Sequence, residues 1–415
     1  MTTTEPLPEV DFTDPDLVWR GLPHDAFRAV RETSPVHWVE QEQSARDGMS
    51  VESGNGYYAL TRHADVAAVS KNSKAFSSWQ NGAIIRFPEG IEREMVEMQR
   101  VIIINQDAPE HTHTRRIVSR AFTPRAVGGL DEVMHDRAEK IVREALEKSD
   151  VDFVTEVAAE LPLQVIADLL GVPQEDRGKL FEWSNLMMSG EDPEYAGQSD
   201  IASAEILGYA MAMAADRLAS PREDLVTQLV HADKDGRGLT EDEFGFFVIA
   251  LTVAGNETTR NAMSHGMNAF LDHPDQWELF LRERPTATMV DEVIRWATPV
   301  NVFQRTALED VDVNGVLVKQ GQRVGLFYGA ANFDPEVFED PYAFDIRRDP
   351  NPHLAFGGHG AHYCIGANLA RMEVGALFNA LADIAPDISR RAEAERLRHS
   401  WINGIKHLPV RLAAG

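Results

Sequence analysis

Cys364 is the only cysteine in the 415-residue chain, and it lies in the segment FGGHGAHYCIG, Phe356–Gly366. The glycines before it allow positive φ angles and let the backbone pass close to a flat object. The helical pattern that follows, IGANLARMEVGALFNALAD, puts the thiol near a helix N-terminus, where the dipole favours a thiolate. The available chemistry is metal ligation by a sulfur anion. A small apolar residue that fills a turn explains this local pattern equally well.

Three further segments contain polar side chains that could act with this cysteine. In AGNETT, Glu257 and Thr258 put an acid next to a hydroxyl. In EVIR, Glu292–Arg295, a carboxylate and a guanidinium lie three residues apart on one helical face, although such pairs are common on helix surfaces. In DAPEHTHTR, His111 and Arg115 are four residues apart and could reach the same anion.

The longest helical pattern must position the acid and the hydroxyl. It begins at Thr240, where Thr240 and Glu243 have capping-box spacing, and runs to Pro274. At 1.5 Å per residue this is roughly 50 Å, enough to cross a whole domain. Its centre, Gly255–Thr259, is poor in helix-forming residues. Polar groups at that point are costly unless something there uses them.

The coarse pattern predicts a mainly α fold with a small antiparallel β portion. Residues 56–62 and 311–328 have strand character, and Asn314-Gly315 is a hairpin turn signal. A helical stretch ends at Gly171. Strands and helices do not alternate regularly, which argues against a doubly wound sheet. We find no composition break and therefore expect one large domain over residues 1–415, with about residues 1–15 flexible.

Composition excludes several classes of function. The 66 acidic and 40 basic residues give a formal charge of −26, which would repel nucleic acid. One cysteine rules out an internal disulfide framework and favours a reducing cytoplasm. No long uncharged apolar run predicts a membrane span, and the N-terminus does not have the pattern of a signal peptide.

Together, the four segments resemble the cytochrome P-450 superfamily of haem-thiolate monooxygenases. The signature G-x-H-x-C-x-G is present as Gly360, His362, Cys364 and Gly366, and the E-x-x-R and A-G-x-[DE]-T-T motifs occur in the family's order. The chain departs from the family at the aromatic residue, which is usually seven positions before the cysteine, because Phe356 is eight positions before it. The resemblance implies the P-450 fold and haem b as the cofactor.

The resemblance also implies roles for the matching residues. Cys364 would be the axial thiolate ligand of iron, in a haem-binding loop that includes Phe356 and Gly366. Haem propionates would be held through charge-assisted hydrogen bonds. The residues that would hold them are His111, Arg115, Arg305 and His362.

Two other implied roles concern the helices. Glu257 and Thr258 would hold water and relay protons, with the helix opened at Gly255. The alternative for Thr258 is a bond to the backbone carbonyl four residues earlier. The E-x-x-R pair would form a structural network with Arg348 rather than Arg347, and breaking it should lose haem and fold together.

Within the superfamily, the chain is similar to the bacterial steroid C26-monooxygenases over almost its whole length, in segments such as AFSSWQNGAIIRF, GEDPEYA and WINGIKH. This resemblance implies hydroxylation, with further oxidation as an option, of the terminal C26/C27 methyl of a cholesterol or cholest-4-en-3-one side chain, using O2. Apolar residues could line a long channel for such a substrate, although each is equally well explained as core. These residues are Ile85, Phe87, Val253, Val302 and Trp401.

The resemblance further implies electrons from NAD(P)H through a separate ferredoxin reductase and ferredoxin. The arginines of HTRRIVSRAFTPR, Arg115, Arg116, Arg120 and Arg125, are either a solvated helix face or a cationic docking patch for an acidic ferredoxin. Two alternatives to the steroid hypothesis remain. One is a monooxygenase of another lipid, such as a methyl-branched fatty acid. The other is a non-catalytic haem-thiolate sensor, against which the intact acid and hydroxyl argue.

Overall fold

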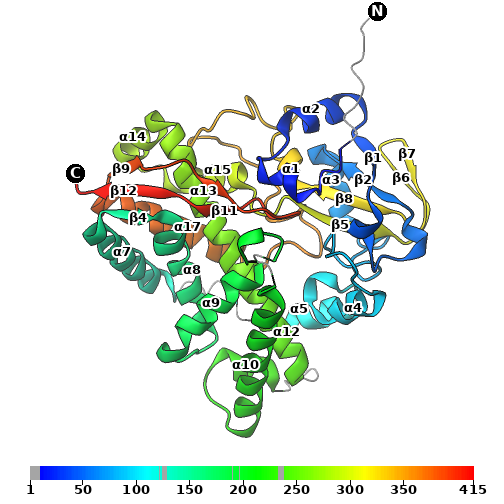
Figure 1. Cartoon of the computed structure of the whole chain (residues 1–415), viewed down its shortest axis with the longest axis horizontal. Coiled ribbons are helices and arrows are strands. Elements are labelled where there is room, and N and C mark those ends of the chain that lie inside the picture. Colours follow the sequence, from blue (N-terminus) through cyan, green and yellow to red (C-terminus); the bar gives the residue numbers. More distant parts are fainter. Residues whose placement is uncertain (1–9, 121, 124–128, 189, 196, 232–237) are drawn as a thin grey trace, which may run out of the picture.

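The computed structural model describes residues 10–120, 122–123, 129–188, 190–195, 197–231 and 238–415. It is mainly helical, with the largest sheet at one end of the molecule, and this confirms the predicted fold class (Figure 1). The helices are α1 (Pro15–Trp19), α2 (His24–Thr33), α3 (His63–Lys71), α4 (Arg93–Met98), α5 (Glu110–Val118), α7 (Asp131–Lys148), α8 (Glu160–Leu169), α9 (Arg177–Met188), α10 (Ser199–Ala219), α11 (Leu225–Val230), α12 (Glu241–Thr252), α13 (Thr258–Asp272), α14 (Pro274–Glu283), α15 (Thr286–Ala297), α16 (Tyr328–Ala331) and α17 (Ala367–Ile384). The strands are β1 (Val36–Glu40), β2 (Gly56–Leu60), β3 (Phe76–Ser77), β4 (Asp150–Asp152), β5 (Val302–Ala307), β6 (Val311–Val313), β7 (Val316–Val318), β8 (Arg323–Phe327), β9 (Asp387–Arg390), β10 (Glu395–Arg396), β11 (Ile405–His407) and β12 (Pro409–Ala413).

The largest sheet has the strand order β1-β2-β8-β5-β3. Its pairs are antiparallel except for β2 and β8, which run parallel. The long stretch of chain between β2 and β8 permits this parallel pairing. The predicted strands are confirmed as β2 and as β6, β7 and β8. Asn314 and Gly315 form the predicted turn, with φ angles of 51° and 84°.

The long helix that crosses the molecule is divided at its centre (Figure 1). The Thr240 side chain accepts from the Glu243 N–H, and the Glu243 carboxylate accepts from the Thr240 N–H at 2.9 Å, so the predicted capping box is present. A π-helical turn, Val253–Glu257, separates α12 from α13. A Cβ at Gly255 would lie 2.9 Å from Ile166 Cδ1, so glycine lets α8 approach the turn.

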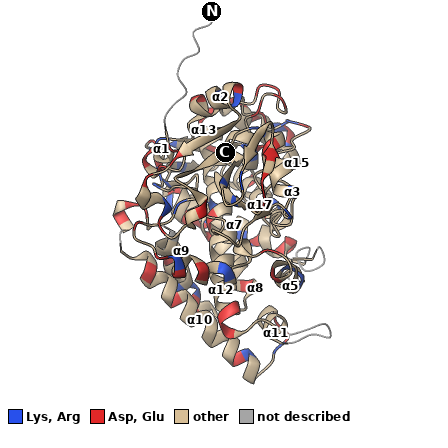
Figure 2. Ribbon diagram, turned by 90° about the vertical axis from the view of Figure 1, so that its right-hand side faces the viewer, with Lys and Arg blue, Asp and Glu red and all other residues tan. Residues whose placement is uncertain are grey.

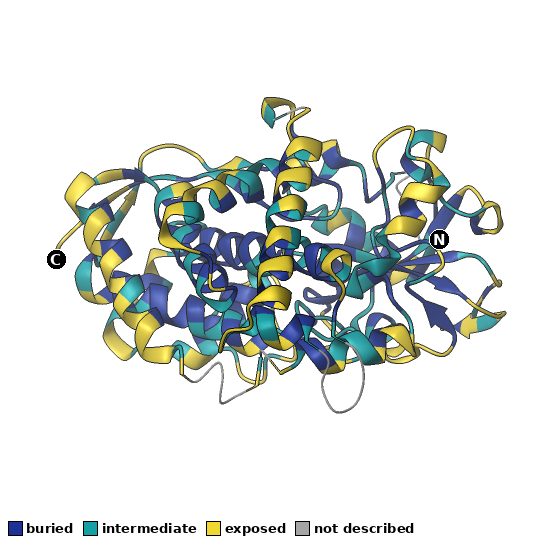
Figure 3. Ribbon diagram, turned by 90° about the horizontal axis from the view of Figure 1, so that it is seen from below, coloured by how far each residue is buried: buried dark blue, intermediate teal, exposed yellow. Residues whose placement is uncertain are grey.

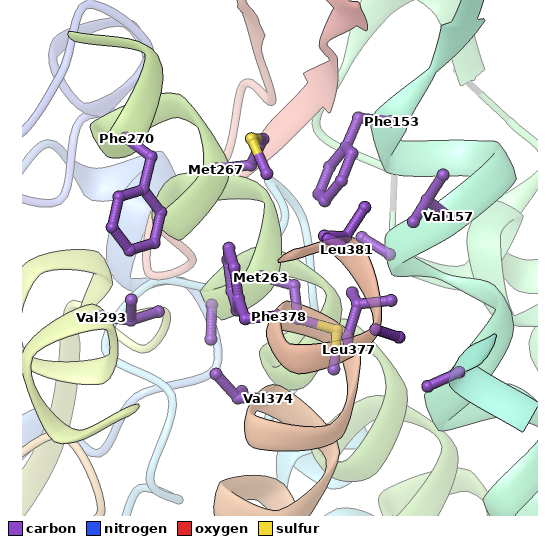
Figure 4. Close-up of a cluster of buried hydrophobic side chains, with 14 of the residues drawn as sticks. Phe153, Val157, Met263, Met267, Phe270, Val293, Val374, Leu377, Phe378 and Leu381 are labelled. Atoms are coloured by element: carbon purple, nitrogen blue, oxygen red, sulfur yellow. The ribbon is translucent and has the colours of Figure 1, made fainter. Parts of the chain in front are cut away.

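The helical core lies where α13, α15 and α17 pack together, and Figure 3 shows buried helices surrounded by half-exposed ones. Figure 4 shows the side chains at this crossing, with Phe378 between Val293 and Met263. Gly266 is required there, because a Cβ would lie 2.7 Å from Val293 Cγ1 and 2.9 Å from Phe378 Cζ. This close packing holds the E-x-x-R helix against the helix that follows the cysteine.

The N-terminal segment is packed from the first described residues. Phe12 is fully buried beside Phe27, and Asp11 accepts from the Tyr57 hydroxyl at 3.0 Å and pairs with Arg86 at 3.0 Å. The segment expected to be flexible, about residues 1–15, is therefore packed over residues 10–15. Residues 1–9 lie outside the described part.

Charged residues are distributed along the helices, including α9 and α10 (Figure 2). The excess of acidic residues fits a surface that repels phosphate. Among the described helices, none has the length and apolar character needed to cross a bilayer.

Candidate active site

Cys364 lies in the loop before α17, and its side chain is half-buried. Its N–H donates to the Phe356 carbonyl at 2.9 Å, and the Gly366 N–H donates to the sulfur. Burial raises the pKa of the thiol, and the Gly366 N–H, Arg115 and Arg371 oppose this rise. The N-terminus of α17 is therefore not sufficient to ionise the Cys364 thiol. A bound metal cation would deprotonate a thiol that coordinates it.

The glycines of the cysteine loop are required for two different structural reasons. Gly357 has a φ of 94° and His359 a φ of 60°, so the loop turns through the left-handed region at both positions. Gly358 and Gly360 do not have positive φ angles, contrary to the prediction for all three glycines. A Cβ at Gly358 would lie 2.4 Å from Ser70 Oγ, and one at Gly360 would lie 1.7 Å from the Ser70 carbonyl oxygen. These two glycines therefore let the loop pack against α3.

An ion pair and a cation–π contact that the sequence did not reveal connect the cysteine loop to α15. The Arg371 guanidinium lies 4.5 Å from the centre of the Phe356 ring and donates through Nε to Asp291 at 2.7 Å. His353 Nε2 lies 3.4 Å from the same carboxylate. The position of Asp291 beside Glu292 was the one available signal, since Arg371 is 80 residues away. Phe356 is thus held in place despite its shifted position in the motif.

The predicted propionate-binding residues come together. The rings of His111 and His362 are 4.2 Å apart, and Arg115 Nη2 donates to the Tyr363 carbonyl at 2.6 Å. Arg305 is almost fully buried in β5. Burial lowers the pKa of His362 to about 2, and Arg305, His111 and Arg115 add to the shift. The cluster is therefore strongly electropositive at neutral pH.

This cluster has cations without counter-ions. Among the described residues, no carboxylate forms an ion pair with Arg115 or Arg305, and the buried His111 Nε2 has no hydrogen-bond partner. The nearby Asp107 is engaged by Ser77 and by the Ser78 N–H, the latter at 2.8 Å. Buried charge requires compensation, so the site fits a ligand that carries carboxylates.

The acid and the hydroxyl of the π-helical turn face different surroundings. Thr258 is partly accessible and donates to the Ala254 carbonyl at 2.6 Å, the backbone bond considered as its alternative role. Glu257 is fully buried, and its Oε1 accepts from Arg260 Nη2 at 2.5 Å and from Asn261 Nδ2 at 2.8 Å. Adjacency in sequence therefore does not place the two groups on one side of the helix.

The E-x-x-R pair is fully buried. Arg295 Nε and Nη2 donate to the two Glu292 oxygens at 2.7 and 2.8 Å, and the guanidinium also donates to three backbone carbonyls. Arg348 Nε donates to Glu292 at 3.2 Å. Arg347 instead pairs with Glu283 at the surface. Arg348 is thus the arginine in this network.

The five candidate substrate residues differ in how deeply they are buried. Val253 and Trp401 pack partly buried in one small cluster with Val300. Ile85 and Val302 are fully buried in the core between the sheet and the N-terminal segment, and Trp401 also packs against this core. Phe87 is buried.

The residue next to Val302 faces the other side of strand β5. Side chains alternate across a strand, so Val302 faces one side of β5 and Phe303 the other. Phe303 lies 5.8 Å from Trp401, measured between ring centres. Alternation along β5 could have identified it, but the face toward the site is fixed only by packing.

The arginines considered as a docking patch lie on or beside α5. Arg116 is exposed, and Arg115 is directed to the cysteine loop. Arg125 lies outside the described residues.

Comparisons with known proteins match this arrangement. The Cytochrome P-450 family model matches residues 285–381. A steroid C26-monooxygenase of Rhodococcus jostii (strain RHA1) is 56% identical over 405 residues, 97% of this chain and 85% of that protein. A methyl-branched lipid omega-hydroxylase of Mycobacterium tuberculosis (strain ATCC 25618 / H37Rv) is 39% identical over 98% of this chain and 96% of that protein.

The chain belongs to the cytochrome P-450 family. A solved Mycobacterium marinum P-450 in complex with pseudoionone is similar over 99% of this chain and 100% of that chain, with a TM-score of 0.89 and 33% identity. This P-450 is therefore a monooxygenase, and the sensor alternative is not supported. Haem is the family's cofactor, and it fits the half-buried sulfur and the buried cations that lack counter-ions.

A buried carboxyl of α17 should make the stability of this P-450 depend on pH. Glu373 is buried, its Oε2 has no hydrogen-bond partner among the described residues, and burial raises its pKa to about 8. Because the folded state favours the protonated form, this contribution to stability is complete below the unfolded pKa. As the pH rises from the unfolded pKa to about 8, this contribution to the free energy of unfolding falls by about 1.4 kcal/mol per pH unit.

The free energy of unfolding of Glu373→Gln minus that of wild type should therefore increase by about 2 kcal/mol between about pH 5.5 and pH 7.5. Urea unfolding of the holoenzyme at these two pH values measures the difference. Glu205→Gln, at an exposed position of α10, is the matched control and should show no such trend. A constant difference between Glu373→Gln and wild type would contradict the prediction.

Proposed function

We propose that this P-450 hydroxylates the terminal C26/C27 methyl of a cholesterol or cholest-4-en-3-one side chain, with O2 as the oxygen donor. Electrons come from NAD(P)H through a separate ferredoxin reductase and ferredoxin, and further oxidation of the product occurs at the same carbon. The single cysteine supports a reducing cytoplasmic location. The observation that carries the proposal is 56% identity over 97% of the chain to a steroid C26-monooxygenase.

Cofactor binding is assigned to the residues around the cysteine loop. When bound, haem supplies the oxygen-activating chemistry of the reaction. Cys364 ligates the iron, Phe356 and Gly366 maintain the loop, and the basic cluster neutralises the haem carboxylates. The residues of that cluster are His111, Arg115, Arg305 and His362. Arg371 and Asp291 fix the loop relative to α15.

Proton delivery is assigned to the π-helical turn. Thr258 is partly accessible, so its hydroxyl can exchange the bond to Ala254 for a bond to water. Glu257 takes protons from the interior side of the helix and passes them through water to Thr258. The open turn supports this role, because π-helical turns free backbone groups and are frequent at functional sites.

Substrate positioning is assigned to the apolar cluster of Val253, Val300 and Trp401, with Phe303 at its edge. A primary C–H bond is harder to attack than the neighbouring tertiary one. The residues must therefore restrain the chain tip rather than only bind the steroid. The partly buried state of Val253 and Trp401 supports contact with a ligand.

Adding cholest-4-en-3-one to the ferric holoenzyme should shift the iron from low to high spin, seen in the Soret absorption. A methyl-branched fatty acid should need at least about ten-fold more ligand for half the change, a difference of about 1.4 kcal/mol. Turnover with ferredoxin and its reductase should then yield the terminally hydroxylated steroid. A response to the fatty acid with none to any steroid would replace the steroid proposal by the lipid one, which the 39% identical omega-hydroxylase favours.

A further inference from the structure

The carboxylate of Glu257 is bound on one side only. Oε1 accepts from Arg260 Nη2 at 2.5 Å and from Asn261 Nδ2 at 2.8 Å. Oε2 is buried and has no hydrogen-bond partner among the described residues. A buried carboxylate oxygen without a partner is costly, so its retention at a functional turn points to a proton or water as its ligand.

Arg260 is attached to another helix as well as to Glu257. Its Nη1 donates to Asn185 Oδ1 on α9 at 2.7 Å. In the same turn, Asn256 Nδ2 donates to Ser184 Oγ at 3.0 Å, and both side chains are fully buried. Two consecutive residues of α9 therefore hold the π-helical turn and its arginine.

The surroundings of this pair include a backbone donor, a phenol and further charged groups. Asn261, which shares Glu257 Oε1, accepts from the Ile405 N–H of β11 at 3.0 Å. Burial raises the pKa of Tyr195, and Arg260 opposes that rise. The same phenol is acted on by the charged groups Glu194, Asp192 and Lys406. Arg260 is the cation in direct contact with Glu257, with a side chain only 9% exposed.

We propose that Arg260 is a positioning residue for proton delivery, and that Asn185 fixes it in place from α9. The ion pair holds Oε1, which leaves Oε2 as the atom that takes up and releases the proton. Oε2 accepts a proton from water and gives it up toward Thr258, so the carboxylate is regenerated and no electron moves. This inference rests on the proton-relay role proposed above for Glu257 and Thr258.

The first test is the infrared titration of the resting holoenzyme, which needs no turnover. The carboxylic acid C=O band that disappears in Glu257→Gln reports the protonation of Glu257. As the pH is lowered, this band should form in Arg260→Gln at a pH at least one unit higher than in wild type. The difference corresponds to an increase of about ten-fold in proton affinity. Arg260→Lys, which keeps a cation, should titrate close to wild type.

The matched control is Arg143→Gln, which removes a surface ion pair with Glu139 that has the same chemistry. It should leave the Glu257 band unchanged. If Arg260→Gln does not fold, Asn185→Ala tests the same inference and should shift the band in the same direction by a smaller amount. An unshifted band in the variant that folds would overturn the inference.

The second test is the solvent isotope effect on turnover and the fraction of reducing equivalents recovered in product. Arg260→Gln should raise the solvent isotope effect and lower the product yield several-fold, and more hydrogen peroxide should be released than in wild type. The steroid-induced spin shift should remain. If Glu257→Gln keeps full coupled turnover, the proposed relay itself is wrong. If Glu257→Gln is impaired but Arg260→Gln changes neither band nor coupling, only the positioning inference is wrong.

Discussion

Cys364→Ala should purify without a haem-thiolate spectrum and should lose monooxygenase turnover by about 1,000-fold or more, equivalent to about 4 kcal/mol of transition-state stabilisation. The sulfur is the one thiol in the chain, so no other residue can replace it as a thiolate ligand. Its carrier loop is fixed independently, by the Cys364 N–H bond to Phe356 and by glycines packed on α3. The variant should therefore fold while lacking the ligand.

The measurement is the absorption of the reduced protein with carbon monoxide, together with steroid product formation. Ala361→Ser, an exposed change in the same loop, is the matched control and should retain both. Far-ultraviolet circular dichroism separates loss of ligand from loss of fold. A Cys364→Ala protein with the wild-type spectrum and turnover would refute the assignment of the iron ligand.

Arg295→Ala should destabilise the fold by about 3–5 kcal/mol and strongly reduce haem content. The side chains of Arg295 and Glu292 are both 0% exposed, so removal of the arginine leaves a buried carboxylate with less compensation. It also removes the donors to three backbone carbonyls. Because total stability is typically about 5–15 kcal/mol, this loss approaches the whole margin.

Urea unfolding and haem per mole of protein measure the effect. Arg347→Ala is the matched control, because this arginine pairs with Glu283 at the surface and exposed pairs contribute about 1 kcal/mol or less. Arg348→Ala should fall between the two, since Arg348 Nε reaches Glu292 at 3.2 Å. Equal unfolding midpoints for Arg295→Ala and Arg347→Ala would contradict a structural role for the buried pair.

Features that depend on near neighbours in the chain were predictable. The capping box at Thr240 and Glu243 and the Asn314-Gly315 turn were found as expected. The helix also opens around Gly255 as the family resemblance implied. In each case the hydrogen bonds or backbone angles involve residues within a few positions of each other, so the local sequence contains the cause.

The sequence could not predict which apolar residues near the site face the core and which face a channel. Apolar character alone could not separate Val302, which faces the buried core of the sheet, from Phe303, which lies near Trp401. A shift of one residue on a strand reverses the side, and packing alone decides which side meets the site. Ile85 is also fully buried in this core, and its apolar character suits a core and a channel equally.

By itself, the sequence determined the mainly helical fold and the ordered motifs around the single cysteine, because these depend on residue type and short spacing. The tertiary structure decided which partners those residues meet: Arg371 for Asp291, Ser70 for the loop glycines, and Asn185 for Arg260. Asn185 is 75 residues from Arg260 in the sequence, and Arg371 is 80 residues from Asp291. Contacts over such separations arise only when helices pack, because no local rule relates the residues before the chain folds.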